Sequence, residues 1–598
     1  MKILENLSSP KDVKNLSVEE LETLSKELRE EIISVVKSNG GHLSSNLGIV
    51  ELTLALYYVF DFPTDKLIFD VGHQCYAHKI LSGRKDEFYS IRTCGGISGF
   101  LDREESEYDA YTTGHAGASV GASLGYCVAR DKLNENYFVV NVVGDGSFVN
   151  GLNLEAFTAS NSKPLKYVTI LNDNGMSISK NKNGLYRFIS KKTVGKKYLK
   201  KKSAFKKVFG DSFITRGLKK FRSFIKRILN GKSYIESFGF KYVGIEDGND
   251  IKRLVKILSA VKDTAEQKAV FLHIRTTKGK GLDIAEEHAD TYHGVGKDLS
   301  VSSGVFATAL GESLKALIKE DQRITAITAG MRDGTGLSVI KEEFPQNFID
   351  VGIAEEYAVT LSAGMASGGL RPIVCIYSTF MQRAYDQILS DVCLQNLPVV
   401  FCLDRSGLVG EDGKTHQGVF DISFLTQMPN LTLLAPTSAK EIEPALRYAL
   451  SLNSPVAIRY PKSSDFCEEI VNEFVSNEWK IVYNGGGEKV VLAVGPVCLE
   501  LALKASNIVK DLIVVSVGTV KPLDENTLNI LIGKKIVTIE ENAVMGGFGS
   551  MVSAFYSQDT KTTVKIMGVP DEFIRHAKRE EQLKSVGITL EELLKNLE

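Results

Sequence analysis

Short runs of apolar residues recur along the chain, and each ends in a glycine or in a cluster of polar residues. Clear examples are residues 137–143 (YFVVNVV) and 167–171 (YVTIL). Continuous apolar runs of this length predict buried strands of a parallel sheet, because helices cover both faces of such a sheet. The stretches between them have helical character, so the pattern predicts an α/β fold with doubly wound sheets.

The same rhythm appears in three successive parts of the chain. In the first part, strand-like runs and helical stretches alternate over residues 50–70 and 137–174, and further strands are predicted at 240–245 and 270–275. The second part has predicted strands at 324–328, 372–376, 399–403 and 456–459, and the third begins near residue 489 with KVVLAV. In the third part, Gly546 to Gly549 open a predicted helix. We therefore predict three doubly wound α/β domains, at 1–297, 298–479 and 480–598.

Residues 180–232 interrupt the first domain with a strongly basic insertion. This segment contains 19 Lys and Arg residues but one acid, Asp211. Between Phe213 and Ile228, apolar residues recur at helical spacing opposite the basic ones, which predicts an amphipathic helix. A solvated insertion or lid near an anionic substrate is the favoured interpretation. A surface that docks on a membrane or a partner is the second, and nucleic-acid binding is disfavoured because readout motifs are missing elsewhere.

Composition narrows the class of protein further. The 72 Lys and Arg residues nearly balance the 73 Asp and Glu residues, so net charge gives no overall attraction to nucleic acid or membranes. The eight cysteines are scattered without disulfide or zinc spacing, which favours buried thiols in a reducing compartment. The chain has neither an apolar run long enough for an integral membrane segment nor a secretion signal at its start. We expect a cytoplasmic protein.

The first chemical signal is the sequence Gly144-Asp145-Gly146, followed by Asn174 further along the chain. Both lie where predicted neighbouring strands end, and ligands of open α/β sheets collect at that edge. A carboxylate and an amide oxygen there can supply two ligands to Mg²⁺ and leave room for a diphosphate. The alternative is a tight turn followed by a helix cap.

Together, these residues resemble the thiamine diphosphate motif, in which GDG precedes an Asn cluster by about thirty residues. The resemblance implies that Asp145 and Asn174 bind Mg²⁺ with the carbonyl group of Met176. It also implies a buried glutamate that hydrogen-bonds to the aminopyrimidine ring of thiamine diphosphate. Glu355, in residues 348–359 (FIDVGIAEEYAV), is the candidate. The alternative for Glu355 is an ordinary acid at a helix N-terminus.

Longer runs extend the likeness over nearly the whole chain, which resembles the 1-deoxy-D-xylulose-5-phosphate synthase family of the transketolase superfamily. They are 41–48 (GHLSSNLG), 70–74 (DVGHQ), 95–100 (GGISGF), 105–109 (ESEYD), 376–387 (IYSTFMQRAYDQ), 404–407 (DRSG), 412–418 (DGKTHQG) and 459–461 (RYP). The resemblance implies a homodimeric transferase that condenses pyruvate with D-glyceraldehyde 3-phosphate, releases CO2 and forms 1-deoxy-D-xylulose 5-phosphate. This product is a precursor of isoprenoids, thiamine and pyridoxal.

The resemblance also gives expected roles to residues around the cofactor. Catalytic roles fall to His42, His293, His416 and Glu355. Contacts with the cofactor are expected from His73, Gly114, His115, Ala116, Gly146, Ser147, Asn174, Lys278, Leu282 and Glu355. Taken singly, each histidine is more often a structural residue, and Lys278 is equally well explained as part of a flexible basic turn.

The remaining expected roles concern the substrates. Arg405 and Arg459, at the ends of predicted strands, and Tyr377 are expected to bind the phosphate of glyceraldehyde 3-phosphate. Arg383 is expected near the carboxylate of pyruvate. Asp412 and His416 share a glycine-bounded loop, where the imidazole can hydrogen-bond to a substrate hydroxyl or an oxyanion. Ion pairs within a domain are the alternative for the arginines.

Four positions depart from the pattern of the family. Glu356-Tyr357 stand where Gln-His usually follows the catalytic glutamate, and Ala116, Leu282 and Asn249 replace a hydroxyl residue, an aromatic residue and a histidine. These changes are expected to loosen contacts with the cofactor. They keep two alternatives open: a transketolase-like paralogue with another donor or acceptor, and a docking scaffold that has lost its activity.

Overall fold

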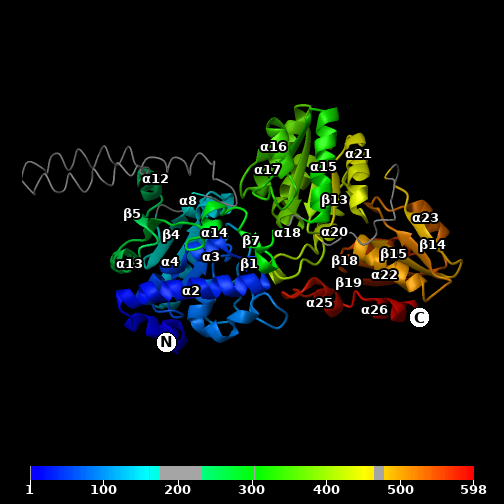
Figure 1. Cartoon of the computed structure of the whole chain (residues 1–598). Coiled ribbons are helices and arrows are strands. Elements are labelled where there is room, and N and C mark those ends of the chain that lie inside the picture. The colour runs from blue at the N-terminus through cyan, green and yellow to red at the C-terminus, as the bar shows by residue number, and fades with distance from the viewer. Residues whose placement is uncertain (1, 160–161, 176–231, 302–303, 463–473, 475–476) are drawn as a thin grey trace, which may run out of the picture. The chain divides into compact units, whose positions relative to one another are not determined.

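The computed structural model describes residues 2–159, 162–175, 232–301, 304–462, 474 and 477–598 (Figure 1). Most of the predicted basic insertion and Met176 lie outside these residues. The chain divides into two compact units, the first formed by residues 1–91 and 96–301 and the second by residues 92–95 and 302–598. Each unit is described separately below.

The first unit is built on a five-stranded parallel sheet with the order β2-β3-β4-β6-β5. Its strands are β2 (Lys66–Phe69), β3 (Val139–Gly144), β4 (Tyr167–Asp173), β5 (Lys241–Asp247) and β6 (Val270–Arg275). All of the strands predicted in this part of the chain are present. Crossover connections through helices are required because parallel neighbours cannot be joined by tight turns.

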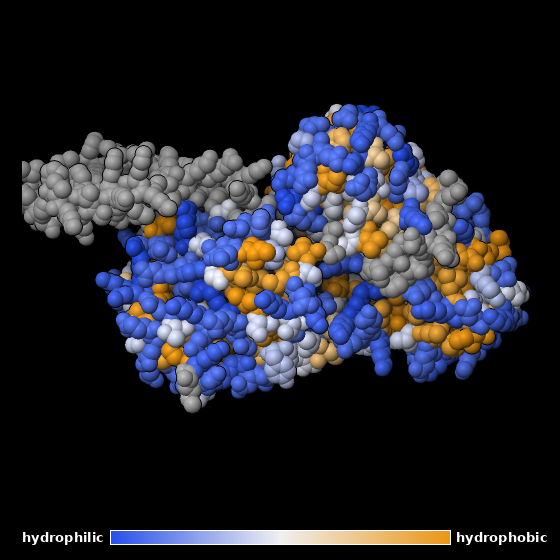
Figure 2. Space-filling model, in the orientation of Figure 1, coloured by the Kyte–Doolittle hydropathy of each residue, from blue (hydrophilic) through white to orange (hydrophobic). Residues whose placement is uncertain are grey.

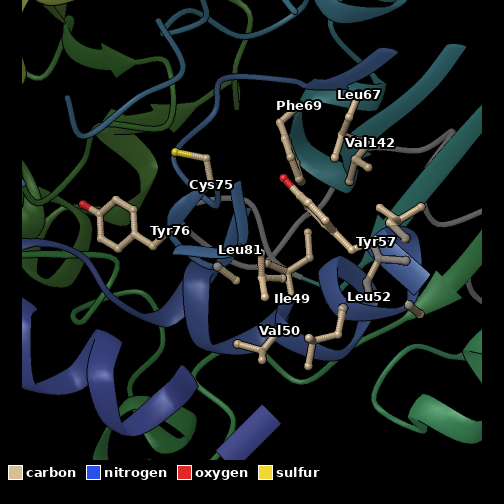
Figure 3. Packing of buried hydrophobic residues seen from close by; sticks show 14 of the residues in the cluster. Ile49, Val50, Leu52, Tyr57, Leu67, Phe69, Cys75, Tyr76, Leu81 and Val142 are labelled. Atoms are coloured by element: carbon tan, nitrogen blue, oxygen red, sulfur yellow. The ribbon is translucent and has the colours of Figure 1, made fainter. Parts of the chain in front are cut away.

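Alternate side chains of these strands enter two different cores, one on each face of the sheet. From β3, Val140 and Val142 face one core, whereas Val139 and Val143 face the other. The first core is covered by α2 (Val18–Asn39), α4 (Val50–Val59) and α13 (Ile251–Ala265), and the second by α6 (Ser119–Leu133) and α8 (Gly151–Thr158). Figure 3 shows part of the first core, where Val142, Leu67 and Phe69 approach side chains of α4. The doubly wound arrangement is therefore confirmed for this unit.

Two very short strands bring distant turns together in the first unit. β1 (Gly41–His42) and β7 (Gly294–Val295) pair antiparallel, so that His42 lies opposite Gly294. The pattern of apolar residues does not predict strands of two residues. Their pairing nevertheless decides which side chains meet near His42.

The second unit contains two sheets. The first has the order β17-β12-β13-β11-β10-β8-β9 and consists of β8 (Ile324–Thr328), β9 (Phe348–Asp350), β10 (Arg371–Tyr377), β11 (Val400–Asp404), β12 (Thr432–Leu434), β13 (Val456–Arg459) and β17 (Thr519–Lys521). The second has the order β14-β16-β15-β18-β19 and consists of β14 (Lys480–Asn484), β15 (Lys489–Val494), β16 (Ile513–Ser516), β18 (Lys535–Ala543) and β19 (Thr563–Val569). In each sheet, neighbouring strands are parallel except at one edge. In the first sheet β17 pairs antiparallel with β12, and in the second β14 pairs antiparallel with β16.

One continuous core joins the two sheets of the second unit. It contains Val374 and Phe401 from the first sheet together with Val490 and Leu492 from the second. The other faces are covered separately, the first sheet by α15 (Val305–Glu320) and α21 (Ile442–Ser451), and the second by α22 (Pro496–Ser506) and α26 (Leu590–Leu597). Because β17 crosses over to pair with β12, the two halves of this unit share both a core and a sheet edge.

The surface drawn in Figure 2 is mostly hydrophilic, with hydrophobic side chains in several separate groups. Among the described residues, no helix is both long enough and apolar enough to cross a membrane.

A buried network of charged and polar groups in the first unit includes His78 of α5 (Tyr76–Lys79). His78 Nε2 lies 3.0 Å from Asp109 Oδ1, and the Tyr57 hydroxyl lies 3.0 Å from His78 Nδ1. Arg84 donates two hydrogen bonds to the Asp109 carboxylate, at 2.7 and 2.9 Å. Burial alone would raise the pKa of Asp109, but His78 and Arg84 hold it far below its usual value. The network ties residues 102–109 to the helix because Asp109 also accepts a hydrogen bond from the backbone N–H of Asp102.

We expect Asp109→Asn to destabilise the first unit strongly. The substitution removes one of the two carboxylates that the buried Arg84 guanidinium contacts, Asp109 and Glu105, and breaking such a buried ion pair costs about 3–5 kcal/mol of unfolding free energy. Urea denaturation of the protein, monitored by limited proteolysis of the first unit, measures this loss of unfolding free energy. Asp131→Asn is the control, because Asp131 pairs with Arg130 but has a side chain that is 56% exposed. Equal effects of the two substitutions would contradict the role given to the buried network.

Candidate active site

Asp145 lies at the carboxyl end of β3, at the first residue of α7 (Asp145–Phe148). It is 2% exposed, and burial raises its pKa well above the usual value, with a further contribution from the nearby Asp173 carboxylate. Lys278 opposes this rise. Burial lowers the pKa of the Lys278 ammonium to about 8, while Asp145 and Asp290 counteract the fall. A buried acid and a buried base therefore lie close together at this edge of the sheet.

The cluster of residues 172–174 lies beside Asp145, because β3 and β4 are parallel neighbours with Gly144 opposite Asn172. The Asn172 side-chain oxygen accepts a hydrogen bond of 2.7 Å from the Thr276 hydroxyl. Asn174 is half-buried and follows directly after the strand. The structure thus brings the two predicted metal ligands, Asp145 and Asn174, to adjacent strand ends. The third, Met176, lies outside the described residues.

Asp173 is held by a chain of hydrogen bonds that the sequence analysis did not anticipate. Its Oδ2 lies 2.9 Å from His273 Nε2, and His273 Nδ1 lies 3.0 Å from the Tyr242 hydroxyl. Arg275 adds a contact of 3.2 Å, and Asp173 Oδ1 accepts from the Gly175 N–H at 3.1 Å. The relay fixes the start of the turn that carries Asn174. His273 stands inside an apolar strand sequence, so its spacing carries no signal of this role.

The donor set at this edge suits a hard divalent cation. A buried carboxylate and an amide oxygen are ligands that Mg²⁺ accepts, and the adjacent Lys278 suits the phosphate oxygens that usually complete such a site. Among the described residues, no group of three or more His, Cys, Asp or Glu side chains is arranged around a metal position. Asp145 and Asn174 together would leave other positions of a bound Mg²⁺ to a diphosphate, a carbonyl group and water.

Three of the five predicted histidines form one group in the first unit. The ring of His42 lies 5.8 Å from that of His73 and 5.7 Å from that of His293, and the last two are 5.1 Å apart. The β1–β7 pair positions His42 near His293. The Asn46 side-chain amide donates to the carbonyl groups of His42 and His73, at 2.6 and 2.9 Å. Such a group of imidazoles can exchange protons with a ligand near neutral pH.

The turn that contains Gly114, His115 and Ala116 is fixed by Asp70, which follows β2. The Asp70 carboxylate accepts hydrogen bonds from the Gly117 N–H at 2.9 Å and from the Ser119 N–H at 3.2 Å. The Asn153 side-chain amide donates to Asp70 and also to the Ser147 carbonyl group, at 3.3 and 2.8 Å. Asp70 thus links the predicted cofactor turns around 115 and 147. The sequence analysis quoted Asp70 within a motif but gave it no role.

Asn249, one of the four departures from the family pattern, uses both its side-chain amide and its side-chain oxygen in hydrogen bonds. Its side-chain amide donates to the Gly48 carbonyl group and to Glu51, both at 3.1 Å, and its side-chain oxygen accepts from the Thr277 N–H at 2.8 Å. Glu51 also pairs with Lys280 at 3.0 Å. These contacts fix the backbone on either side of Lys278. Leu282 packs against the first core of the unit and offers no polar group.

Glu355, in the second unit, is the first residue of α17 (Glu355–Ser367), which follows β9 through a turn. It is 3% exposed, and its Oε2 accepts no hydrogen bond from the part of the chain that the structure describes. Arg383 Nε lies 3.6 Å from Glu355 Oε2 and 3.7 Å from Glu356 Oε1. Burial raises the pKa of Glu355 to about 7, Arg383 opposes the rise and Glu356 adds to it. The structure therefore provides a buried acid that is half-protonated near neutral pH and has a free oxygen for a ligand.

Tyr377, Phe380, Arg405 and His416 lie together in the second unit. The Arg405 guanidinium lies 3.7 Å from the centre of the Tyr377 ring, and Arg405 adopts the left-handed backbone region at φ 60°. The Phe380 ring lies 5.9 Å from that of Tyr377 and 5.5 Å from that of His416. A strained backbone that aims a cation over an aromatic ring is typical of a binding site.

Asp404, which the sequence analysis did not single out, precedes Arg405 at the end of β11. Burial raises its pKa to about 7, and its Oδ2 accepts no hydrogen bond among the described residues. The carboxyl group also raises the pKa of Tyr377, which reaches about 12 mainly through burial. Its sequence signals are its place directly after a predicted strand and its position as the first residue of the run 404–407 (DRSG).

Arg459 occupies a different environment from Arg405. Its Nε donates to Asp421 Oδ2 at 3.0 Å, and its Nη2 donates to the Glu541 carbonyl group at 3.3 Å. It also lines a small cleft with Ser406, Pro461 and Glu541. The structure therefore shows an ion pair for Arg459, which was the alternative to phosphate binding in the sequence analysis.

Comparison with known proteins assigns the class of the fold. The family models for the pyrimidine-binding domain and the C-terminal domain of transketolase match residues 305–465 and 478–593, and the model for 1-deoxy-D-xylulose-5-phosphate synthase matches residues 4–276. A transketolase of known structure from Campylobacter jejuni is 17% identical, with a TM-score of 0.43 over 97% of this chain and 99% of its own. The three family models identify the chain as a multidomain α/β protein of the transketolase type.

Curated relatives give a narrower assignment. A 1-deoxy-D-xylulose-5-phosphate synthase of Clostridium tetani is 44% identical over 98% of this chain and 97% of its own length. One from Carboxydothermus hydrogenoformans is 43% identical over 99% of this chain and 98% of its own. The chain belongs to the 1-deoxy-D-xylulose-5-phosphate synthase family.

We expect Glu355→Gln to change how stability depends on pH. A carboxyl group whose folded pKa of about 7 exceeds its unfolded value binds protons more tightly in the folded state. The wild type therefore loses stability as pH rises from about 4.5 to 7, by roughly 3 kcal/mol in total, and the amide variant escapes this loss. Thermal unfolding of the ligand-free proteins at pH 5 and pH 8 measures the difference.

Glu312→Gln is the control for this measurement, because Glu312 is exposed on α15 of the same unit. It should follow the wild type at both pH values. Parallel pH profiles for wild type and Glu355→Gln would show that Glu355 titrates as an ordinary carboxyl group.

Proposed function

We propose that the protein condenses pyruvate with D-glyceraldehyde 3-phosphate, with release of CO2, to form 1-deoxy-D-xylulose 5-phosphate. The observation that carries the proposal is the near full-length match, at 44% identity, to a relative of that name. The buried acid at Glu355 and the paired strand ends at Asp145 and Asn174 support a thiamine diphosphate enzyme in particular. The four departures leave these three residues intact.

The residues at the carboxyl edge of the first sheet would hold the diphosphate end of the cofactor. Asp145 and Asn174 would bind Mg²⁺, and the Lys278 ammonium would neutralise a phosphate oxygen. Gly146 and Ser147, at the start of α7, would lie beside the same diphosphate. When bound, thiamine diphosphate supplies the electron sink that the decarboxylation of pyruvate requires.

Glu355 would hold the aminopyrimidine end through a hydrogen bond from its protonated Oε2. A carboxyl group with a pKa of about 7 can both hold and release a proton at physiological pH. Its burial also keeps water away from the proton that it carries. In the first unit, the rings of His42, His73 and His293 lie 5.1 to 5.8 Å apart, and these imidazoles would exchange protons with substrate oxygens.

The phosphorylated aldehyde would be bound in the second unit. Arg405, stacked on Tyr377, offers its guanidinium edge to the phosphate group, and His416 offers an imidazole to a substrate hydroxyl. Arg459 would join this clamp only by exchanging its bond with Asp421 for one with the phosphate. Arg383 lies beside Glu355, where a small anion such as the pyruvate carboxylate would meet its positive charge.

The organisation of the protein follows from the same proposal. We propose a diphosphate-binding domain at 1–297, a pyrimidine-binding domain at 298–479 and a C-terminal domain at 480–598, assembled as a homodimer. Matches of separate family models to 4–276, 305–465 and 478–593 support these boundaries. The described cysteines are free thiols, which supports a cytoplasmic location.

The test is a turnover assay with the purified full-length chain, thiamine diphosphate and Mg²⁺. With pyruvate and glyceraldehyde 3-phosphate together, we expect CO2 and 1-deoxy-D-xylulose 5-phosphate in equal amounts, identified by NMR. Glu355→Gln should lower kcat by about 10²–10⁴-fold, because it removes the proton-transfer group. Glu312→Gln should leave kcat unchanged.

Two other outcomes identify the alternatives. Product formed from a ketose phosphate donor without CO2 would indicate a transketolase-like paralogue. No turnover with either donor would indicate a scaffold that has lost its activity.

Metal binding gives a separate prediction. Asp145→Asn removes the anionic ligand, so we expect Mg²⁺-dependent binding of thiamine diphosphate to weaken by at least about 100-fold. Titration calorimetry of the stripped protein, with and without Mg²⁺, measures this change. Asp131→Asn, an exposed substitution in the same unit, is the control. Unchanged affinity in Asp145→Asn would remove Asp145 from the metal site.

A further inference from the structure

The loop of residues 407–418, here called the acceptor loop, joins β11 to α20 (Asp421–Leu425) and carries Asp412 and His416. Its two ends are closed by reciprocal hydrogen bonds of 2.8 Å between Gly407 and Gly418. From outside the loop, the Thr379 hydroxyl donates a hydrogen bond of 3.1 Å to the carbonyl group of Thr415 within it. These contacts fix the ends of the loop and the neighbourhood of His416, but not the tip around Gly410.

Around the tip, Gln417 accepts a hydrogen bond from the Val409 N–H and Arg92 pairs with Asp412, while Gly410 itself is held by a side chain from the far end of the sequence. Gln582 lies on α25 (Arg579–Ser585), coloured red in Figure 1, and is 1% exposed. Its Oε1 accepts a hydrogen bond from the Gly410 N–H at 2.8 Å, and its Nε2 donates to the Gly410 carbonyl group at 2.9 Å. The same Nε2 donates to the Arg575 carbonyl group at 2.8 Å. One carboxamide thus satisfies both backbone groups of Gly410.

Neighbouring contacts also attach the acceptor loop to the region around α25. Arg579 Nε donates to the Leu408 carbonyl group at 2.9 Å, and the Arg579 guanidinium pairs with Glu541 at 2.5 Å. Leu408 also packs with Ile574 in a small apolar cluster. Ile574 and Arg579 therefore contact the loop at Leu408, next to its closed end, and Gln582 binds its tip.

Two glycines allow this close approach. Gly410 and Gly413 have φ values of +90° and +65°, which L side chains rarely adopt. A Cβ atom on Gly413 would come within 2.8 Å of the His576 N atom. The backbone of the acceptor loop is thus shaped to lie against residues 574–582, and only a side chain with a donor and an acceptor at one end can pair with both groups of Gly410.

We propose that Gln582 is a positioning residue for the phosphorylated aldehyde: by holding Gly410 through its carboxamide, it fixes the acceptor loop and thereby the placement of Asp412 and His416. The proposal rests on the proposed function, in which these two residues face the acceptor. It gives the C-terminal part of the chain a direct effect on the binding of the second substrate.

The test is Gln582→Met, which keeps the length of the side chain but removes the three hydrogen bonds. We expect the KM for glyceraldehyde 3-phosphate to rise about tenfold, because the loop tip is released, while kcat changes less than about twofold. Thiamine diphosphate affinity, measured by calorimetry, should stay within about twofold of the wild type. Hydrogen exchange of the amides of residues 407–418 should accelerate about tenfold in the protein without substrates.

Gln558→Met is the matched control, because Gln558 is exposed in the same C-terminal part of the chain. It should leave KM and loop exchange unchanged. If Gln582→Met does not fold, Gln582→Asn keeps the polar group but does not reach Gly410, and it should raise KM and loop exchange in the same direction.

The outcomes separate this proposal from the proposed function. Loop exchange equal to that of the control, or faster loop exchange without a change in KM, would overturn the role of Gln582. If the wild type forms no product from pyruvate and glyceraldehyde 3-phosphate, the proposed function fails. In that case the exchange measurement alone decides whether Gln582 holds the loop.

Discussion

The candidate chemistry of this protein depends on carboxyl groups that are buried at the ends of strands. Asp145 follows β3 and Glu355 follows the turn after β9, and both are almost inaccessible to water. Burial of a charged carboxylate is costly, so each group either stays protonated or requires a nearby cation. Lys278 lies near the first and Arg383 near the second. The parallel sheets form a rigid frame that keeps these carboxyl groups in place. Ligands that bind there would supply the polar contacts that the carboxyl groups lose when they are buried away from water.

Polar side chains from other parts of the chain hold the turns that surround these groups. Asp70 holds the turn around 117, Asn249 holds the backbone beside Lys278, and Gln582 holds the tip of the acceptor loop. Each of these side chains bonds to backbone groups, which do not depend on the identity of the residues in the turn. The turn sequences can therefore vary, as at Ala116 and Leu282, while the geometry of the backbone is kept.

Periodicity and motifs predicted the strands, the doubly wound sheets and the strand-end positions of Asp145, Asn174 and Glu355, because these features depend on local sequence. Contacts between distant residues could not be predicted in this way. Gln582 meets Gly410 across 172 residues of sequence, and β17 crosses to another sheet. His273 is hidden in an apolar strand, where its hydrogen-bond partners alone reveal its role. The roles of the basic insertion and of Met176 remain predictions, since both lie outside the described residues apart from Lys232.

The sequence departure at Glu356 acts on the proton of Glu355 through Arg383. The guanidinium Nε lies 3.6 Å from one carboxylate and 3.7 Å from the other, so its charge is shared. Arg383 alone would stabilise the ionised form of Glu355, whereas a second negative charge opposes ionisation. An uncharged residue at 356 would leave the cation to Glu355 and lower its pKa. The glutamate at this position therefore favours the protonated form, which is the form that donates a hydrogen bond to a ring nitrogen. Glu356 thus strengthens the feature on which the candidate chemistry depends.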